Sequence, residues 1–305
     1  MHRAAWVMGT ELRLALVAQD ERRGQEAAEA AFAAVRQLDD ILSTWRDDTE
    51  LQRLNRAPPG EVVRVSPALG ALLSQVWRWW RETGGTFDPG VGPLVDVWGV
   101  RGTLRQPTED ELARALGNSG LRQFEFDPTR RNIVRRSAGA WLDSGGFGKG
   151  AALRSVQAVL RASGIHAALV DFGGQGLAVG SSPEAPPSGG WTIGVAHPAE
   201  RLVPVRELVI RDRSVSTSGQ SERPGHVLDP RSGRPVPAWG SVTVVAQDPL
   251  VADILSTALF VMGLDDGLRW VSGRNDVGAL FLILRDGRVE ARWNQAMEPF
   301  LKEKR

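Results

Sequence analysis

Short turns between strand-like segments are the feature that most constrains how this chain can fold. Ala279–Leu284 and Val289–Ala291 are apolar segments on either side of Asp286-Gly287, a dipeptide typical of tight hairpins. Phe124–Phe126 and Asn132–Arg135 form a second pair of this kind. A hairpin pairs its strands antiparallel, whereas a parallel pair needs a long crossover. The sequence therefore predicts sheets that are largely antiparallel.

Helical patterns lie between these strands without a regular alternation. Glu21–Thr44 carries apolar residues at helical spacing, and Ser66-Pro67 is a good start for a helix that continues to about Thr83. Asp248-Pro249 similarly precedes the apolar helix Val251–Met262. We expect an α+β fold of mixed sheets flanked by helices. A single domain over 1–305, which could contain two closely packed subdomains, is the predicted organisation.

Charge and hydropathy exclude two classes of partner. The 37 basic and 36 acidic side chains leave a net charge of +1 without a long basic block, and a nucleic-acid groove needs a concentrated positive stripe. No apolar segment approaches the roughly 18–20 residues of a membrane-spanning helix. The first twenty residues also lack the pattern of a signal peptide. As the sequence stands, a cytoplasmic location is expected.

The residue types available for chemistry are restricted. There is no cysteine, so a metal ion must be bound through oxygen or nitrogen, and thiolate nucleophiles and disulfides are excluded. Only three of the 37 basic residues are lysines, and one of them, Lys149, lies between two glycines. This placement favours a site that needs a compact positive charge, although chance would also explain it.

The segment Asp143–Gly150 is the strongest candidate for binding phosphate. Its glycines allow a ligand to approach backbone N–H groups, the following helix start favours an anion, and Lys149 supplies a counter-charge. The spacing is not that of a P-loop. A purely structural glycine-rich turn is the alternative.

Asp253 and Thr257 are four residues apart on the apolar helix, so they share one face. A carboxylate and a hydroxyl directed to one point suit Mg²⁺, which keeps few protein ligands and takes the others from phosphate and water. The alternative is that Asp253 caps the helix and Thr257 bonds back to its own helix.

A third group of polar residues follows a predicted strand. Thr217-Ser218-Gly219 precedes His226 and Asp229 by a few residues, so hydroxyls, an imidazole and a carboxylate lie close together in the sequence. Histidine is the side chain best suited to accept a proton near neutral pH. A surface histidine in a turn is the alternative explanation for His226.

Taken in order, these segments resemble the bacterial ApbE-type FAD:protein FMN transferases. The matching motifs are Met8-Gly9-Thr10, Ser43-Thr44-Trp45 with Thr49–Asn55, Gly85–Leu94 with Trp98-Gly99, Asp143–Gly150, Gly173-Gly174, Thr217–Gly219, His226–Gly233 and Ala252–Ala258. Each match is weak alone, but eight in the family's order extend from Met8 to about Gly263.

The resemblance implies a role for each matched residue. Magnesium would be held by Asp253, Thr257 and the backbone carbonyl of Gly146, and the catalytic residues would be His226 as base with Asp253 and Lys149. FAD would contact Met8, Trp45, Thr86, Phe87, Asp88, Asp143, Lys149, Thr217, Ser218 and Gly219.

The implied reaction is transfer of FMN from FAD to a Thr or Ser hydroxyl of an acceptor protein, with release of AMP. The acceptor would belong to a redox or electron-transport system. Members of the family are often exported or membrane-anchored, whereas this sequence shows neither a leader nor a lipid-modified Cys.

Departures from the family pattern keep two other functions open. Gln220-Ser221 replaces the usual Asp-Tyr after the Thr-Ser-Gly motif, which affects how an acceptor is held. Hydrolysis of FAD to FMN and AMP would need the same site as transfer. A protein that binds FAD without turnover is the third possibility.

Overall fold

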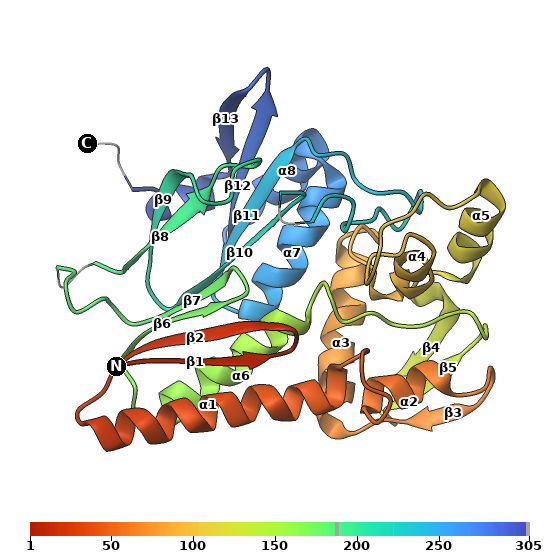
Figure 1. Cartoon of the computed structure of the whole chain (residues 1–305), viewed down its shortest axis with the longest axis horizontal. Helices are drawn as coiled ribbons and strands as arrows, with labels where there is room; N and C mark the ends of the chain where they lie inside the picture. The colour runs from red at the N-terminus through yellow and green to blue at the C-terminus, as the bar shows by residue number, and fades with distance from the viewer. Residues whose placement is uncertain (187–188, 222, 303–305) are drawn as a thin grey trace. The chain divides into compact units, whose positions relative to one another are not determined.

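A computed structural model describes residues 1–186, 189–221 and 223–302 (Figure 1). The chain forms two compact units, each assembled from separate stretches of sequence. Unit 1 comprises Met1–Leu38, Gly148–Glu222 and Ala238–Arg305, and unit 2 comprises Asp39–Phe147 and Arg223–Pro237. The predicted α+β class is therefore realised in two bodies, which are described separately below.

Unit 1 contains an eight-stranded antiparallel sheet with the order β1-β2-β6-β7-β10-β11-β12-β13. Its strands are β1 (His2–Val7), β2 (Thr10–Val17), β6 (Ala167–Phe172), β7 (Gln175–Val179), β10 (Arg213–Gly219), β11 (Gly240–Ala246), β12 (Val277–Arg285) and β13 (Arg288–Trp293). A separate hairpin pairs β8 (Trp191–Ala196) with β9 (Pro204–Ile210). The predicted hairpin about Asp286-Gly287 is confirmed as β12–β13, and both turn residues have positive φ.

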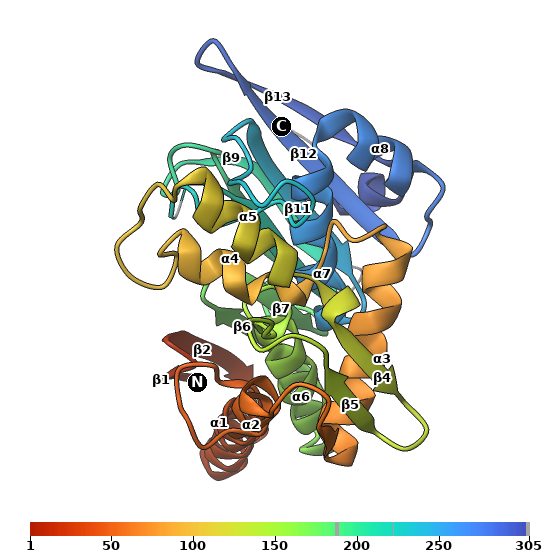
Figure 2. The same ribbon diagram turned by 90° about the vertical axis from the view of Figure 1, so that its right-hand side faces the viewer.

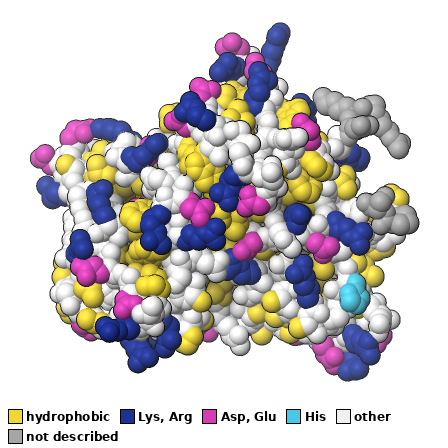
Figure 3. All heavy atoms as spheres, turned by 180° about the vertical axis from the view of Figure 1, so that it is seen from behind, with side chains coloured by type: hydrophobic (Ala, Val, Ile, Leu, Met, Phe, Trp, Pro, Cys, Tyr) yellow, Lys and Arg dark blue, Asp and Glu magenta, His cyan; other side chains and the backbone are white. Residues whose placement is uncertain are grey.

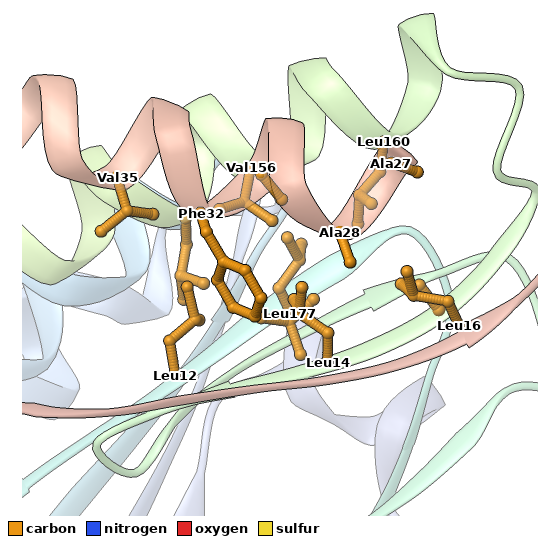
Figure 4. Close-up of a cluster of buried hydrophobic side chains, with 14 of the residues drawn as sticks. Leu12, Leu14, Leu16, Ala27, Ala28, Phe32, Val35, Val156, Leu160 and Leu177 are labelled. Atoms are coloured by element: carbon orange, nitrogen blue, oxygen red, sulfur yellow. The ribbon is translucent and has the colours of Figure 1, made fainter. Parts of the chain in front are cut away.

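Helices cover one face of this sheet. They are α1 (Glu21–Leu42), whose residues up to Leu38 belong to the unit, α6 (Gly148–Ala162), α7 (Pro249–Met262) and α8 (Leu264–Ser272). The short η3 (Gln295–Phe300) packs with the β8–β9 hairpin on the opposite face, against Leu280 and Leu282 of β12. Figure 4 shows Phe32 and Val35 of α1 and Val156 of α6 directed onto Leu12 and Leu14 of β2. Alternate β2 residues face the helices because side chains along a strand alternate between the two faces. Burial of these apolar side chains is the main contribution to the stability of the layer.

The first two strands, β1 and β2, form a hairpin whose turn is Met8-Gly9, with φ values of 50° and 74°. A two-residue turn with positive φ at both positions matches the twist of the flanking strands. Met8, a predicted FAD contact, is therefore a turn residue that also packs against the core of unit 1.

Two element boundaries differ from the prediction near the candidate site. The helix expected after the Asp143–Gly150 segment begins within it, at Gly148, so Lys149 lies in its first turn. Thr217-Ser218-Gly219, expected after a strand, are the last three residues of β10. In both cases glycine residues led to the wrong predicted boundary, because glycine is uncommon inside helices and strands.

Unit 2 is mainly helical and contains a three-stranded antiparallel sheet with the order β3-β5-β4. The strands are β3 (Val62–Arg64), β4 (Phe124–Asp127) and β5 (Asn132–Arg135), and the helices are α2 (Glu50–Arg56), α3 (Pro67–Glu82), η1 (Pro89–Val91), α4 (Gly92–Val97), α5 (Glu109–Asn118) and η2 (Leu121–Gln123). In Figure 2, α3 lies beside β4, and Trp77 stacks at a tilt on Phe126 with 5.0 Å between ring centroids. The predicted hairpin and the predicted helix start at Ser66-Pro67 are confirmed, and Thr108 caps α5.

The surface carries both signs of charge. Figure 3 shows Arg and Lys side chains mixed with Asp and Glu over one face of the molecule. Among the described residues, no helix combines the length and the apolar character needed to cross a bilayer.

Candidate active site

The carboxylate of Asp253 is the centre of the polar cluster in unit 1. Asp253 lies on α7, which packs against β10 and β11, and only 5% of the residue is exposed. Its Oδ2 accepts a hydrogen bond of 2.8 Å from the backbone N–H of Gly150 on α6. The interpretation of Asp253 as a helix cap is therefore wrong. Asp248 is the cap, and its side chain accepts from the N–H of Leu250.

Gly150 is needed for this approach. A Cβ at position 150 would lie 2.6 Å from both the Cβ of Asp253 and the carbonyl oxygen of Pro249. Real Cβ atoms are not found so close to other heavy atoms, so only glycine lets the start of α6 reach α7. The start of α6 and the apolar helix α7 therefore meet at Gly150 and Asp253, which are 103 residues apart in the sequence.

Burial and charge act in opposite directions on Asp253. Removal from water raises the pKa of the carboxyl, while the positive charge of Lys149 and the hydrogen bond from Gly150 lower it. Lys149 also donates a hydrogen bond of 3.3 Å to the carbonyl oxygen of Gly173, at the end of β6. The cluster thus places a buried carboxyl group beside Lys149, the only lysine outside the C-terminal tail. Such an arrangement is stable only when the charge is compensated.

Hydroxyl groups from α7 and β10 surround the carboxylate. Ser256 lies between Ser216 and Ser218, with oxygen–oxygen distances of 3.1 and 2.9 Å, and its own hydroxyl is 3.0 Å from the backbone oxygen of Asp253. Thr257 makes only longer contacts, 3.3 Å to Ser218 and 3.4 Å to the Asp253 backbone oxygen. The hydrogen bond from the Thr257 hydroxyl back to its own helix is therefore present but weak.

These groups fit a magnesium ion. Carboxylate and hydroxyl oxygens are the hard donors that Mg²⁺ prefers, and Asp253 and Thr257 present both kinds from one face of α7. Among residues 1–186, 189–221 and 223–302, no three His, Asp or Glu side chains gather into a cage. A magnesium ion here would take most of its remaining ligands from phosphate and water, as this ion commonly does.

Other predicted residues of unit 1 lie in different surroundings. Thr217 is next to Ser218 on β10 and therefore faces the opposite side of the sheet, where its hydroxyl is 2.8 Å from that of Thr243. Gly219 ends the strand close to Ser241, which a Cβ would approach to 3.1 Å. The structure therefore brings Lys149, Ser218, Asp253 and Thr257 together in unit 1 but directs Thr217 elsewhere.

In unit 2 the predicted residues Trp45 and Asp143 meet at a residue that the sequence analysis missed, Arg101. The Arg101 guanidinium forms an ion pair with Asp143 and donates hydrogen bonds to the backbone oxygen and hydroxyl of Thr44. Its central carbon is 5.2 Å from the ring centroid of Trp45 and 4.5 Å from that of Trp141. The only local signal was an arginine shortly after Trp98-Gly99.

The strip Thr86-Phe87-Asp88 is tightly held within unit 2. Thr86 donates to the carbonyl of Thr83, and the ring of Phe87 meets that of Phe147 edge to face, with 6.5 Å between centroids. Asp88 caps η1 by accepting from the N–H of Gly90 at 2.8 Å and from that of Leu121 at 2.9 Å. Burial nevertheless raises the pKa of Asp88 to about 6.

His226 and Gly146 also belong to unit 2. Nδ1 of His226 is hydrogen-bonded to the carbonyl oxygen of Arg223. Because a carbonyl only accepts, Nδ1 carries the proton in this bond, and in the neutral ring Nε2 then has the lone pair. This tautomer suits a base acting through Nε2. Gly146 follows Asp143 in the turn whose Gly145 N–H bonds to the Asp143 carboxylate.

The order of these motifs is that of a known family, whose model, described as the ApbE family, matches residues 8–281. The chain belongs to the ApbE family. An ApbE relative from Klebsiella pneumoniae, named FAD:protein FMN transferase, is 30% identical over 94% of this chain and 85% of its own length. One of the same name from Salmonella typhimurium is 29% identical over the same shares.

Solved ApbE structures have the same fold. The flavin transferase ApbE from Vibrio cholerae superimposes with a TM-score of 0.87, at 25% identity and 99% coverage of both chains. The ApbE protein from Thermotoga maritima gives a TM-score of 0.88, at 26% identity and 99% coverage of both chains. The predicted family and the α+β ApbE fold are thus confirmed.

Proposed function

We propose that this protein is an FAD:protein FMN transferase that uses magnesium. The observation that carries the proposal is the convergence of Lys149, Gly150 and Asp253 on one buried point, surrounded by hydroxyl oxygens. That point combines a positive charge for a phosphate with hard oxygen donors for a divalent cation. The names of the relatives above supply the substrate, FAD, and the product, a flavinylated protein.

The magnesium ligands that we propose are Asp253 and Thr257 of α7. When bound, the ion would neutralise charge that builds up on the diphosphate during transfer. Lys149 is assigned to the same diphosphate because its compact ammonium charge can offset part of the negative charge of that group. FAD would further contact Met8, Trp45, the 86–88 strip, Asp143, Ser218 and Gly219.

The chemical step is a displacement at phosphorus. The hydroxyl oxygen of an acceptor Thr or Ser attacks the FMN-side phosphorus, the bond from that phosphorus to the bridging oxygen breaks, and AMP leaves with the bridging oxygen. His226 accepts the hydroxyl proton at Nε2, the nitrogen left unprotonated when Nδ1 donates to Arg223. Positioning of the two reactants supplies much of the remaining rate enhancement.

The acceptor we propose is a protein of a redox or electron-transport system. A covalently attached flavin is useful only where electrons are moved, which is the reason for this choice. Gln220, the first residue of the altered segment, is 5% exposed, so its side chain is part of the unit 1 interior.

The test is to incubate the protein with FAD, Mg²⁺ and a Thr-containing acceptor domain and to follow the products by mass spectrometry. A covalent FMN adduct with one AMP per adduct is expected. Free FMN without an adduct would identify a hydrolase, and FAD that is bound but unchanged would identify a carrier. Asp253→Ala should abolish magnesium-dependent turnover, whereas intact turnover in this variant would refute the metal assignment.

A further inference from the structure

Arg101 is held between two indoles and a carboxylate in unit 2. We propose that Arg101 is a positioning residue that prepares Trp45 and Asp143 to receive FAD, and this proposal rests on the function proposed above. It binds no reacting atom in our scheme. Its contribution is to fix a ring surface and a carboxylate before the ligand arrives, which lowers the entropy cost of binding.

The contacts of Arg101 are those of an arginine and not those of a lysine. Its Nη1 donates 3.0 Å to the backbone oxygen of Thr44, and its Nη2 donates to the Thr44 hydroxyl and to Asp143. The in-plane donors are thus directed at oxygens, while the guanidinium carbon lies over the rings of Trp45 and Trp141. A planar fork that bonds at its edge and stacks through its faces is specific to guanidinium.

The Trp45 ring needs such support because most of its surface faces solvent. The residue is 70% exposed and follows directly after the bonded Thr44. An exposed indole otherwise samples several rotamers. With Arg101 against one side, the ring keeps one orientation and offers its remaining surface to a planar group, which in FAD is the flavin or the adenine.

Asp143 gives the second argument. Its side chain is only 13% exposed, and that of Arg101 only 22%, so their charges interact with little screening. A bare carboxylate at this depth would repel the diphosphate of FAD. Paired with Arg101, it presents no net negative charge, so the anionic ligand can bind beside it.

The test compares Arg101→Met and Arg101→Lys with Arg274→Lys as the control. Arg274 has a similar environment in unit 1, with its carbon 5.0 Å from the Trp270 centroid, an ion pair to Asp276 at 3.0 Å and a side chain 23% exposed. The Kd for FAD is measured by quenching of flavin fluorescence, and kcat and KM by the transfer assay. Arg101→Met should raise Kd and KM about ten-fold while kcat changes less than about three-fold.

Arg101→Lys keeps the charge but loses the fork, so it should recover only part of the affinity; Arg274→Lys should bind FAD like the wild type. If Arg101→Met does not fold, Arg101→Lys decides the question. Wild-type affinity in the Arg101 variants, or a loss confined to kcat, overturns the proposal. A wild-type protein that neither binds nor consumes FAD overturns the proposed function itself.

A double variant tests the electrostatic part. In the Asp143→Asn background there is no carboxylate at position 143 to repel the FAD diphosphate. The effect of Arg101→Met on Kd should therefore be at least about three-fold smaller there than in the wild type. An undiminished effect in the Asp143→Asn background would refute the charge-pairing argument.

Discussion

Some single residues of this protein serve two purposes at once, one in packing or capping and one in compensating a charge. Gly150 is the clearest case, because its N–H compensates the Asp253 carboxylate and its missing side chain lets two helices approach. Asp88 is similar, since its carboxylate caps η1 and ties Leu121 to it at the cost of desolvation. Substitutions at such positions change stability by a mechanism that can be named.

Gly150→Ala should destabilise the protein by about 1–3 kcal/mol, because the new methyl group overlaps Asp253 and Pro249. Urea unfolding followed by circular dichroism measures the effect. The matched control is Gly117→Ala, which also replaces a helical glycine but has no heavy atom within 4 Å of the new Cβ. This control should be neutral or slightly stabilising. Equal losses in both variants would contradict the close-approach argument.

The raised pKa of Asp88 predicts a pH-dependent stability. A carboxyl with an ordinary pKa of 3.8 and a folded pKa of about 6 binds its proton more tightly in the folded state. Its stabilising contribution is complete below pH 4 and is lost as the pH rises to about 6, amounting to up to about 3 kcal/mol. Relative to Asp88→Asn, the wild type should therefore lose stability between pH 4 and 6 in urea titrations. Parallel curves for the two proteins would exclude this cause.

At the scale of elements, the site of unit 1 is the contact of α7 with β10 and α6. The helix brings Asp253, Ser256 and Thr257 to one side because residues three and four apart share a face. The strand brings Ser216 and Ser218 to the same side because residues two apart do so. Two different periodicities thus meet at one cluster of hydroxyls.

Removal of the shared hydroxyl tests this arrangement. Ser256→Ala should cost about 1–3 kcal/mol, because Ser216 and Ser218 each lose a buried hydrogen-bond partner. Thermal unfolding measures the loss. Ser272→Ala removes one exposed hydroxyl that bonds to its own helix α8, so its effect should stay within about 0.5 kcal/mol. A Ser256 variant as stable as this control would show that the hydroxyl network contributes nothing.

At the scale of the whole molecule, the proposed function makes the stability of the folded chain depend on its ligand. A ligand that binds only the folded protein raises its stability by mass action. The stability of the chain is therefore a direct measure of the proposed FAD site.

FAD with Mg²⁺ should stabilise the protein by about 2.7 kcal/mol when FAD is present at 100 times its Kd. Differential scanning calorimetry should show the rise in melting temperature. Asp253→Ala should show a much smaller rise, and a chelator should remove the magnesium-dependent part in the wild type. An equal shift in wild type and variant, with or without chelator, would count against a metal-assisted site at Asp253.

The sequence by itself determined the features that depend on neighbours along the chain. Caps at Ser66 and Asp248 and the turn at Asp286-Gly287 were predictable because a few adjacent residues decide such structures. The family could also be identified from the sequence, because its motifs are short and occur in a fixed order along the chain. The Met8-Gly9 turn and the start of α6 at Gly148 were not predicted, because Met is not typical of such turns and glycine is unfavourable inside a helix.

Only the tertiary structure decided which distant groups meet. Asp253 is 103 residues from its partner Gly150, and Arg101 is 42 residues from Asp143. No local pattern encodes such pairs, because they depend on which helix face and which strand side become buried together. The physical reason is that long-range packing, and not the propensity of any segment, decides where buried charge finds its compensation.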